Sequence, residues 1–213
     1  MAQWTSGCSR LKITVLVEGK TERAFKPHLL EFLANRLTGR MPHLDFFPCD
    51  GRIYKEAKLR RTVEALLQNG RVPSDAVIAL TDVYTGTNEF SDAADAKQKM
   101  REWVGKNNDK FYPHAAQYDF EAWLLPFWTD IQALAGHRKG PPPGPPEAVN
   151  HDRPPSHYLR EIFRIGTCRG DYSKPRDAAR ILRGKDLTIA ANKCPELKAF
   201  LNTILTLSGS DPL

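Results

Sequence analysis

The sequence has no long hydrophobic run, no closely spaced cysteines and no N-terminal export signal. Its apolar stretches are short, as at residues 76–80, whereas a membrane-spanning helix needs about 20 apolar residues. The first residues lack the basic and apolar regions of a secretory signal, so we expect a cytoplasmic protein that does not bind membranes. The cysteines lie far apart and form no C-x-x-C pair, which argues against disulfides and zinc: Cys8, Cys49, Cys168 and Cys194.

Positive charge is concentrated in one part of the chain. Residues 137–193 hold twelve Lys or Arg and six acids, whereas the rest of the chain holds nineteen of each sign. The formal net charge of +6 therefore arises entirely from this region. Such a basic segment favours a polyanionic partner, because each phosphate contact releases counterions. A solvated basic surface without a partner is the alternative.

Short apolar runs alternate with helical patterns over the first 130 residues. The runs predict strands at 12–17, 44–48, 75–80 and 111–117, and the helical patterns between them cover about 25–37, 54–69 and 91–104. Strands that alternate with helices of this length imply right-handed crossovers. We therefore predict an α/β fold with a mostly parallel sheet flanked by helices.

Five prolines within residues 140–146 exclude a helix or a central strand there. Beyond them the pattern is helical and basic, at about 156–164, 175–183 and 195–205. We predict three parts: a domain over 1–139, a proline-rich connector over 140–155, and a helical basic extension over 156–213 that packs on the same domain.

Each of three predicted strands is followed closely by a carboxylate. These residues are Glu18, Asp82 and Glu121, and we expect them to converge because the carboxyl ends of parallel strands form the binding crevice. Converging carboxylates repel one another unless a cation neutralises them, and hard oxygen ligands suit Mg²⁺ or Mn²⁺. Such an ion can activate water for displacement at phosphorus. An acid after a strand is also a common helix N-cap, which is the alternative for Asp119.

Three motifs contain these carboxylates: Glu18-Gly-Lys-Thr-Glu22, Asp82-Val-Tyr84, and Asp119-Phe-Glu121-Ala. Together they resemble the E-G-x-T-E, D-x-Y and E-F-E-A patterns of a Toprim-like family of unknown function. Members of that family are typically encoded beside ABC-type or OLD-type ATPases, in loci that look like phage defence. The resemblance covers roughly residues 12–130. It implies a Toprim-like, Rossmann-like metal-binding domain within 1–139.

The resemblance also implies roles for single residues. Glu18 and Asp82 match acidic positions of Toprim domains, whereas Tyr84 stands where their second aspartate would be. Glu121 is then the replacement ligand. The set implied for catalysis is Glu18, Asp82, Glu121 and Lys20, and the set implied for metal binding is Glu18, Asp82, Glu121, Glu22 and Asp119. A solvated Lys20 without a role is the alternative.

Candidate substrate-binding residues flank this acidic set. His114 lies near the end of a strand that leads into the predicted site, and arginines of the extension could hold a phosphate backbone. The set is Tyr84, His114, Arg160, Arg164, Arg169, Arg176, Arg180 and Arg183. Trp123 could stack on bases, but its helical spacing favours a place in the core.

The leading hypothesis is a Mg²⁺-dependent nuclease that acts on DNA or RNA, as an anti-phage effector with an ATPase partner. The main alternative is a non-catalytic subunit that binds nucleotide or nucleic acid and regulates an ATPase, because the second aspartate is missing. An enzyme of small phosphorylated metabolites stays open, since the same metal chemistry serves it. A P-loop is excluded, because the first glycine of that motif would fall at Thr14.

Overall fold

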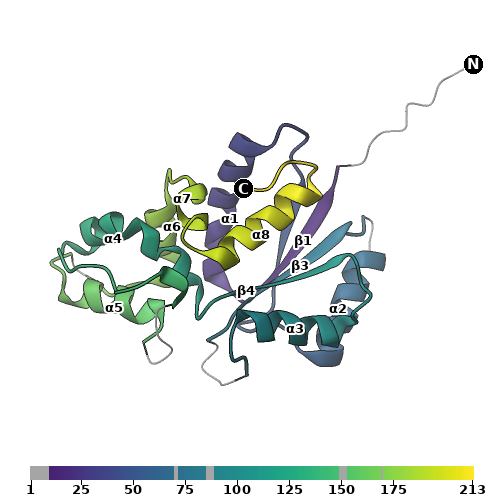
Figure 1. Ribbon diagram of the computed structural model, residues 1–213, viewed down its shortest axis with the longest axis horizontal. Helices are drawn as coiled ribbons and strands as arrows, with labels where there is room; N and C mark the ends of the chain where they lie inside the picture. Colours follow the sequence, from purple (N-terminus) through teal and green to yellow (C-terminus); the bar gives the residue numbers. More distant parts are fainter. Residues whose placement is uncertain (1–9, 70–71, 85–88, 149–152, 169) are drawn as a thin grey trace, which may run out of the picture.

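A parallel β-sheet forms the centre of the protein (Figure 1). The computed structural model describes residues 10–69, 72–84, 89–148, 153–168 and 170–213. Within these ranges four strands lie in the order β2-β1-β3-β4, and every neighbouring pair is parallel. The strands are β1 (Lys12–Val17), β2 (His43–Pro48), β3 (Ala76–Asp82) and β4 (Phe111–Ala116). The predicted α/β class with a parallel sheet is confirmed.

Helices cover both faces of this sheet (Figure 1). Successive side chains of a strand point to opposite faces, so Val15 and Val17 pack in one cluster and Leu16 in another. α1 (Lys20–Arg36) and α8 (Pro195–Leu207) contribute to the first cluster, and α2 (Glu56–Gln68) and α3 (Ala93–Val104) to the second. Burial on both sides explains why β1 is an almost continuous apolar run.

The chain after β4 is helical. Directly after the sheet it forms two short 3₁₀ turns, where the sequence favoured one helix after Asp119; Pro126 lacks the N–H donor that a regular helix would need. α6 packs on α1, and α8 packs on β4. No helix in the described ranges is long and apolar enough to cross a bilayer. The elements are η1 (Phe120–Trp123), η2 (Leu125–Phe127), α4 (Trp128–Ala135), η3 (Pro146–Ala148), α5 (Pro155–Ile165), α6 (Lys174–Leu182) and α7 (Leu187–Ala191).

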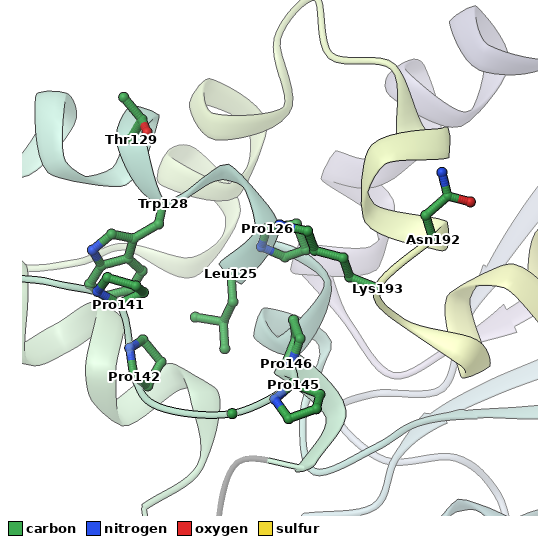
Figure 2. Close-up of a pocket in the computed structure, with 11 residues that line it drawn as sticks. Leu125, Pro126, Trp128, Thr129, Pro141, Pro142, Pro145, Pro146, Asn192 and Lys193 are labelled. Atoms are coloured by element: carbon green, nitrogen blue, oxygen red, sulfur yellow. The ribbon is translucent and has the colours of Figure 1, made fainter.

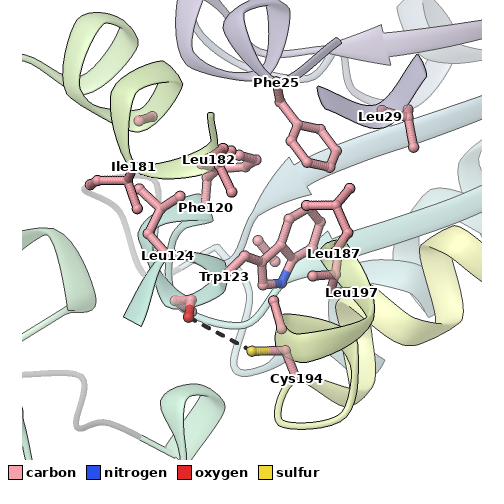
Figure 3. Packing of buried hydrophobic residues seen from close by; sticks show 14 of the residues in the cluster. Phe25, Leu29, Phe120, Trp123, Leu124, Ile181, Leu182, Leu187, Cys194 and Leu197 are labelled. Atoms are coloured by element: carbon pink, nitrogen blue, oxygen red, sulfur yellow. Dashed lines mark hydrogen bonds between the residues drawn. The ribbon is translucent and has the colours of Figure 1, made fainter. Parts of the chain in front are cut away.

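Trp123 lies at the centre of the larger cluster (Figure 3). It is 1% exposed, and its ring lies 6.0 Å from that of Phe200 and 5.3 Å from that of Phe120. The Cys194 thiol approaches the Ala122 carbonyl at 3.7 Å on the same side of this core. Trp123 is therefore a core residue, as its spacing favoured, and its face is not available to a base.

The proline-rich segment is held to α4 by hydrogen bonds. Trp128 Nε1–H and the Gln132 side-chain amide both donate to the Lys139 carbonyl, at 2.8 and 2.9 Å. Residues 137–145 form neither helix nor strand. Figure 2 shows Trp128 beside Pro141, at the edge of a cavity of about 600 Å³. The prolines thus lie against the domain surface along this stretch.

Gly166, where α5 ends against α4, provides a test of the packing between these helices. A Cβ atom there would lie 1.9 Å from the Ala135 carbonyl oxygen, so Gly166→Ala requires a backbone shift. We expect it to lower the free energy of unfolding by about 1–3 kcal/mol, measured by urea denaturation. Gly140→Ala is the control, because no other described residue beyond its chain neighbours has an atom within 4 Å of its Cβ position. Equal stability of the two variants would contradict this packing.

Candidate functional site

Five carboxylates gather at the carboxyl edge of the sheet. Glu18 follows β1 directly and Asp82 ends β3, while Asp119 and Glu121 lie just beyond β4. Glu22, in the first turn of α1, completes the set. These side chains are close enough to affect one another: the Glu22 charge raises the pKa of Glu18, and the Glu18 charge raises the pKa of Asp82. In the same way, the Glu121 charge raises the pKa of Asp119. The structure therefore brings all five predicted metal-binding residues together.

The end of β3 holds the Glu18 carboxylate. The Thr81 hydroxyl and the Asp82 backbone N–H both donate to Glu18 Oε1, the latter at 3.2 Å. Glu22 turns back over the start of its own helix and accepts the Gly19 N–H at 2.9 Å. Both carboxylates are buried, at 9% and 6% exposure, so these bonds replace only part of their hydration.

The turn after β4 positions the other acids. Tyr118 adopts a left-handed backbone with φ of 70°, which costs energy for a residue other than glycine. Beyond it, the Phe120 N–H donates to Asp82 Oδ1 at 2.9 Å. Asp119 Oδ2 accepts the Ser156 N–H at 3.1 Å, whereas its buried Oδ1 has no hydrogen-bond partner among the described residues. A buried carboxylate oxygen without a donor favours a cation or a proton at this position.

Glu121 is completely buried and receives its partners from the C-terminal region. The Lys174 ammonium forms an ion pair with Oε2 at 3.0 Å, and the Tyr172 hydroxyl donates to Oε1 at 3.2 Å. Both partners come from the start of α6 and the loop before it. The basic extension therefore supplies a counter-charge to the acidic edge of the sheet.

Burial and mutual repulsion raise the pKa values of four acids of this set, Glu18, Glu22, Asp82 and Asp119. Loss of hydration, together with the Glu22 charge, raises the pKa of Glu18 to about 7. Burial and the Glu121 charge likewise raise the pKa of Asp119 to about 7. The pKa of Asp82 lies well above its ordinary value for the same two reasons. Burial lowers the pKa of Lys174, but the surrounding carboxylates outweigh it and raise the value, so the ammonium stays charged.

The donor set has the chemistry that a hard divalent cation requires. All five side chains offer carboxylate oxygens, which Mg²⁺ and Mn²⁺ prefer, and Asp119 Oδ1 has no partner in the described part of the chain. The positions of these side chains do not form a complete metal site: among the described residues, no three His, Cys, Asp or Glu side chains are arranged to hold one metal ion. Ligation by Glu121 would require Lys174 to move away from its carboxylate.

The remaining predicted residues lie in different surroundings. Lys20 is exposed at the first position of α1, and the exposed fraction of Tyr84, which follows β3, is 46%. Arg176 and Arg180 form ion pairs with the buried carboxylate of Asp177. Exposed arginines without such a role are Arg160, Arg164 and Arg183, and Arg169 lies outside the described residues.

His114 lies within β4, two residues before the strand ends at Ala116. Its Nε2 hydrogen-bonds to Thr203 Oγ1 of α8 at 2.9 Å, and its ring packs edge-on against Phe200. Asp82 pairs with Ala116, two residues further along the strand. The imidazole is therefore directed to α8 and not to the carboxylates.

Sequence reasoning missed Lys174, Tyr172 and Ser156. They lie in the basic extension, whose charge suggested a polyanion as partner. No motif or periodicity marks Lys174 among its basic neighbours. Only the packing of α6 on α1 brings it to Glu121. An excess of positive charge in a segment that follows an acidic motif is the only signal that could have suggested it.

The raised pKa values predict how stability depends on pH without metal. Between the ordinary carboxylate range and about pH 7, folded Glu18 and Asp119 hold protons that the unfolded chain has lost. The free energy of unfolding should therefore fall as pH rises from about 5 to about 8, measured by urea denaturation in EDTA. Glu18→Gln should reduce this fall. Stability that rises over the window would show that the acids are not destabilised by ionisation.

The Lys174–Glu121 pair predicts a second effect on stability. Lys174→Met leaves the buried Glu121 carboxylate without its counter-ion and should lower the unfolding free energy by about 2 kcal/mol. This loss is smaller than for a fully buried pair because the Lys174 side chain is 35% exposed. Lys185→Met is the control, since its partner Asp130 is partly exposed and such pairs contribute at most about 1 kcal/mol. Equal losses would contradict a special role of Lys174.

Comparison with known proteins identifies a family but no activity. The model of a family described as a domain of unknown function (DUF4276) matches residues 17–205. This range contains all five carboxylates as well as Tyr172 and Lys174. The comparisons with curated proteins and with solved structures found no match. The chain belongs to the DUF4276 family.

Proposed function

We propose that this protein is a Mg²⁺- or Mn²⁺-dependent phosphodiesterase of Toprim type that cleaves DNA or RNA. One observation carries the proposal: five carboxylates, which repel one another, meet where parallel strands end, and the pKa values of Glu18, Glu22, Asp82 and Asp119 are raised. Such a cluster is costly in an isolated fold, and enzymes tolerate that cost where a cation or a reaction requires it.

Glu18, Asp82 and Glu121 would hold the metal, with Glu22 and Asp119 available for a second ion or for orienting water. When bound, the ion supplies an activated water and stabilises negative charge on the phosphate oxygens. Thr81 and the Phe120 N–H orient Glu18 and Asp82 before any ion arrives. Lys174 neutralises Glu121, and beside a bound metal its ammonium would be a cation for the phosphate.

A polymeric substrate is supported by the exposed arginines of α5 and by Arg183 after α6. They form no ion pair within the described chain, so their charges are available to a phosphate backbone. The resemblance of the three motifs to the Toprim-like family extends the proposal to its setting. We propose an effector of anti-phage defence that works with an ABC-type or OLD-type ATPase.

A second candidate is a non-catalytic subunit that binds nucleotide or nucleic acid and regulates such an ATPase. The Lys174–Glu121 ion pair favours it, because an internal ammonium neutralises part of the acidic cluster without any metal. The absence of three suitably arranged ligands among the described residues points the same way. The two candidates differ in whether metal binding leads to hydrolysis.

Cleavage assays with the purified chain test the proposal. Plasmid DNA and tRNA are incubated with Mg²⁺, Mn²⁺ or EDTA, and we expect cleavage only with metal. Glu18→Gln and Asp82→Asn should each reduce the rate by about 100-fold or more, because each removes a charged metal ligand. Asp45→Asn, which changes an exposed acid of β2, should cleave like the unchanged protein.

The outcomes separate the two candidates. Circular dichroism and thermal denaturation verify that each variant is folded, and calorimetry with Mn²⁺ measures metal binding independently of activity. Cleavage that survives both substitutions would overturn the assignment of the site. Mn²⁺ binding that depends on Glu18, without hydrolysis of either polymer in the presence or absence of the ATPase, would favour the regulatory subunit.

A further inference from the structure

A second cavity lies along the open edge of the sheet, beside β4. It has a volume of about 640 Å³, within the range of sites for small organic ligands. α3 lines one side, Thr203 of α8 lies on the other, and the strand itself contributes Tyr112, Pro113 and His114. In Figure 1, β4 runs between α3 and α8, which cover opposite faces of the sheet. The groove is therefore framed by three elements.

Basic side chains dominate the charge of this groove. Lys97, Arg101 and Lys106 line it, against the single acid Glu102. Lys97 is already bound to Glu196 of α8 at 2.7 Å, and Lys106 lies 3.8 Å from Glu102. Arg101 is exposed and forms no ion pair within the described part of the chain. Its guanidinium is available to an anion, and guanidinium groups bind phosphate through paired hydrogen bonds.

His114 adds an unused acceptor to the wall of the groove. Thr203 gives its single hydroxyl hydrogen to the Ala199 carbonyl, so His114 Nε2 carries the hydrogen of the bond between the two side chains. Nδ1 is then an acceptor. It is buried on a residue that is 6% exposed, and no residue that the structure describes donates to it. Burial, together with Lys97 and Arg101, lowers the pKa of His114 to about 3, so the ring stays neutral.

The edge strand itself is poorly suited to pair with another strand. The Val77 N–H donates to the Lys110 carbonyl, and the Val83 N–H donates to the Ala116 carbonyl. In a parallel ladder, successive residues of a strand direct their backbone N–H and C=O groups alternately to one side and the other. The backbone groups of the even-numbered residues of β4 therefore point to β3, whereas the backbone of Pro113 points to the open edge. Proline offers no N–H to a further strand, a common protection of sheet edges. A small ligand therefore fits this edge better than an added strand.

We propose that the groove between α3 and α8 binds a free mononucleotide. Its phosphate would lie against Arg101, which has no ion pair within the described part of the chain, and against Lys106, whose long ion pair with Glu102 is exposed to solvent. Its base would lie beside Tyr112, and an N–H group of the base would reach the unpaired His114 nitrogen after a side-chain shift that uncovers this buried atom. This inference goes beyond the proposed phosphodiesterase and needs neither the metal nor the carboxylates.

Calorimetric titration in EDTA tests this site with AMP, GMP, CMP, UMP and inorganic phosphate as separate ligands. We expect at least one mononucleotide to bind with a Kd below about 1 mM, and inorganic phosphate to bind at least about tenfold more weakly. The double variant Arg101→Gln/Lys106→Gln should weaken the nucleotide by about tenfold or more, because both charged phosphate contacts are lost. Both residues are exposed, so the fold should persist, which circular dichroism verifies.

Two controls separate this site from the carboxylate cluster. Arg61→Gln removes an exposed charge of α2, and Glu18→Gln alters the carboxylate cluster; neither should change nucleotide affinity. Absence of binding at millimolar nucleotide would overturn the proposal, as would equal affinity in the double variant. Phosphate that binds as tightly as every nucleotide would also overturn it, because the nucleoside would then contribute nothing. Because the titration contains no metal, its result does not depend on whether the protein cleaves phosphodiesters.

Discussion

Repulsion among five carboxylates at one edge of the sheet is the constraint on which the rest of the structure depends. Four of them are buried and Asp82 is partly buried, so water screens their charges poorly. Backbone N–H groups after the strands and at the start of α5 offset part of the cost, and the Lys174 ammonium offsets another part. Raised pKa values show that compensation is incomplete. A fold stabilises such a cluster only if other packing is strong enough to hold it.

That packing comes from both halves of the chain. The first half places the acids, because its strands are parallel and end at the same edge. The second half closes over them, since α6 packs on α1 and brings Tyr172 and Lys174 to Glu121. Trp123, two residues after Glu121, anchors the intervening turn in the core between the rings of Phe120 and Phe200. The acidic edge and the C-terminal helices therefore form one structural unit.

The positions of the acids could be predicted from the sequence, whereas the positions of their partners could not. Alternation of apolar runs and helices predicts a parallel sheet, and a parallel sheet forces Glu18 and Asp82 to the same edge. Glu121 was found in the same way, although it lies on a 3₁₀ turn rather than a regular helix. Lys174 could not be found, because its position depends on how two helices far apart in sequence pack. The surroundings of His114 could not be predicted either, because a strand pattern gives the direction of the chain but not which helix covers a side chain.

The contacts of the basic residues show how much of the positive charge is available to a ligand. A positive excess in the extension suggested a polyanion, but several of these charges are used inside the protein. Arg176 and Arg180 neutralise Asp177, which is completely buried, and Lys174 neutralises Glu121. Charges committed to buried acids cannot release counterions from a nucleic acid. An electrostatic argument for a phosphate ligand therefore depends on the charges that remain: the exposed arginines of α5 with Arg183, and Arg101 in the separate groove beside β4.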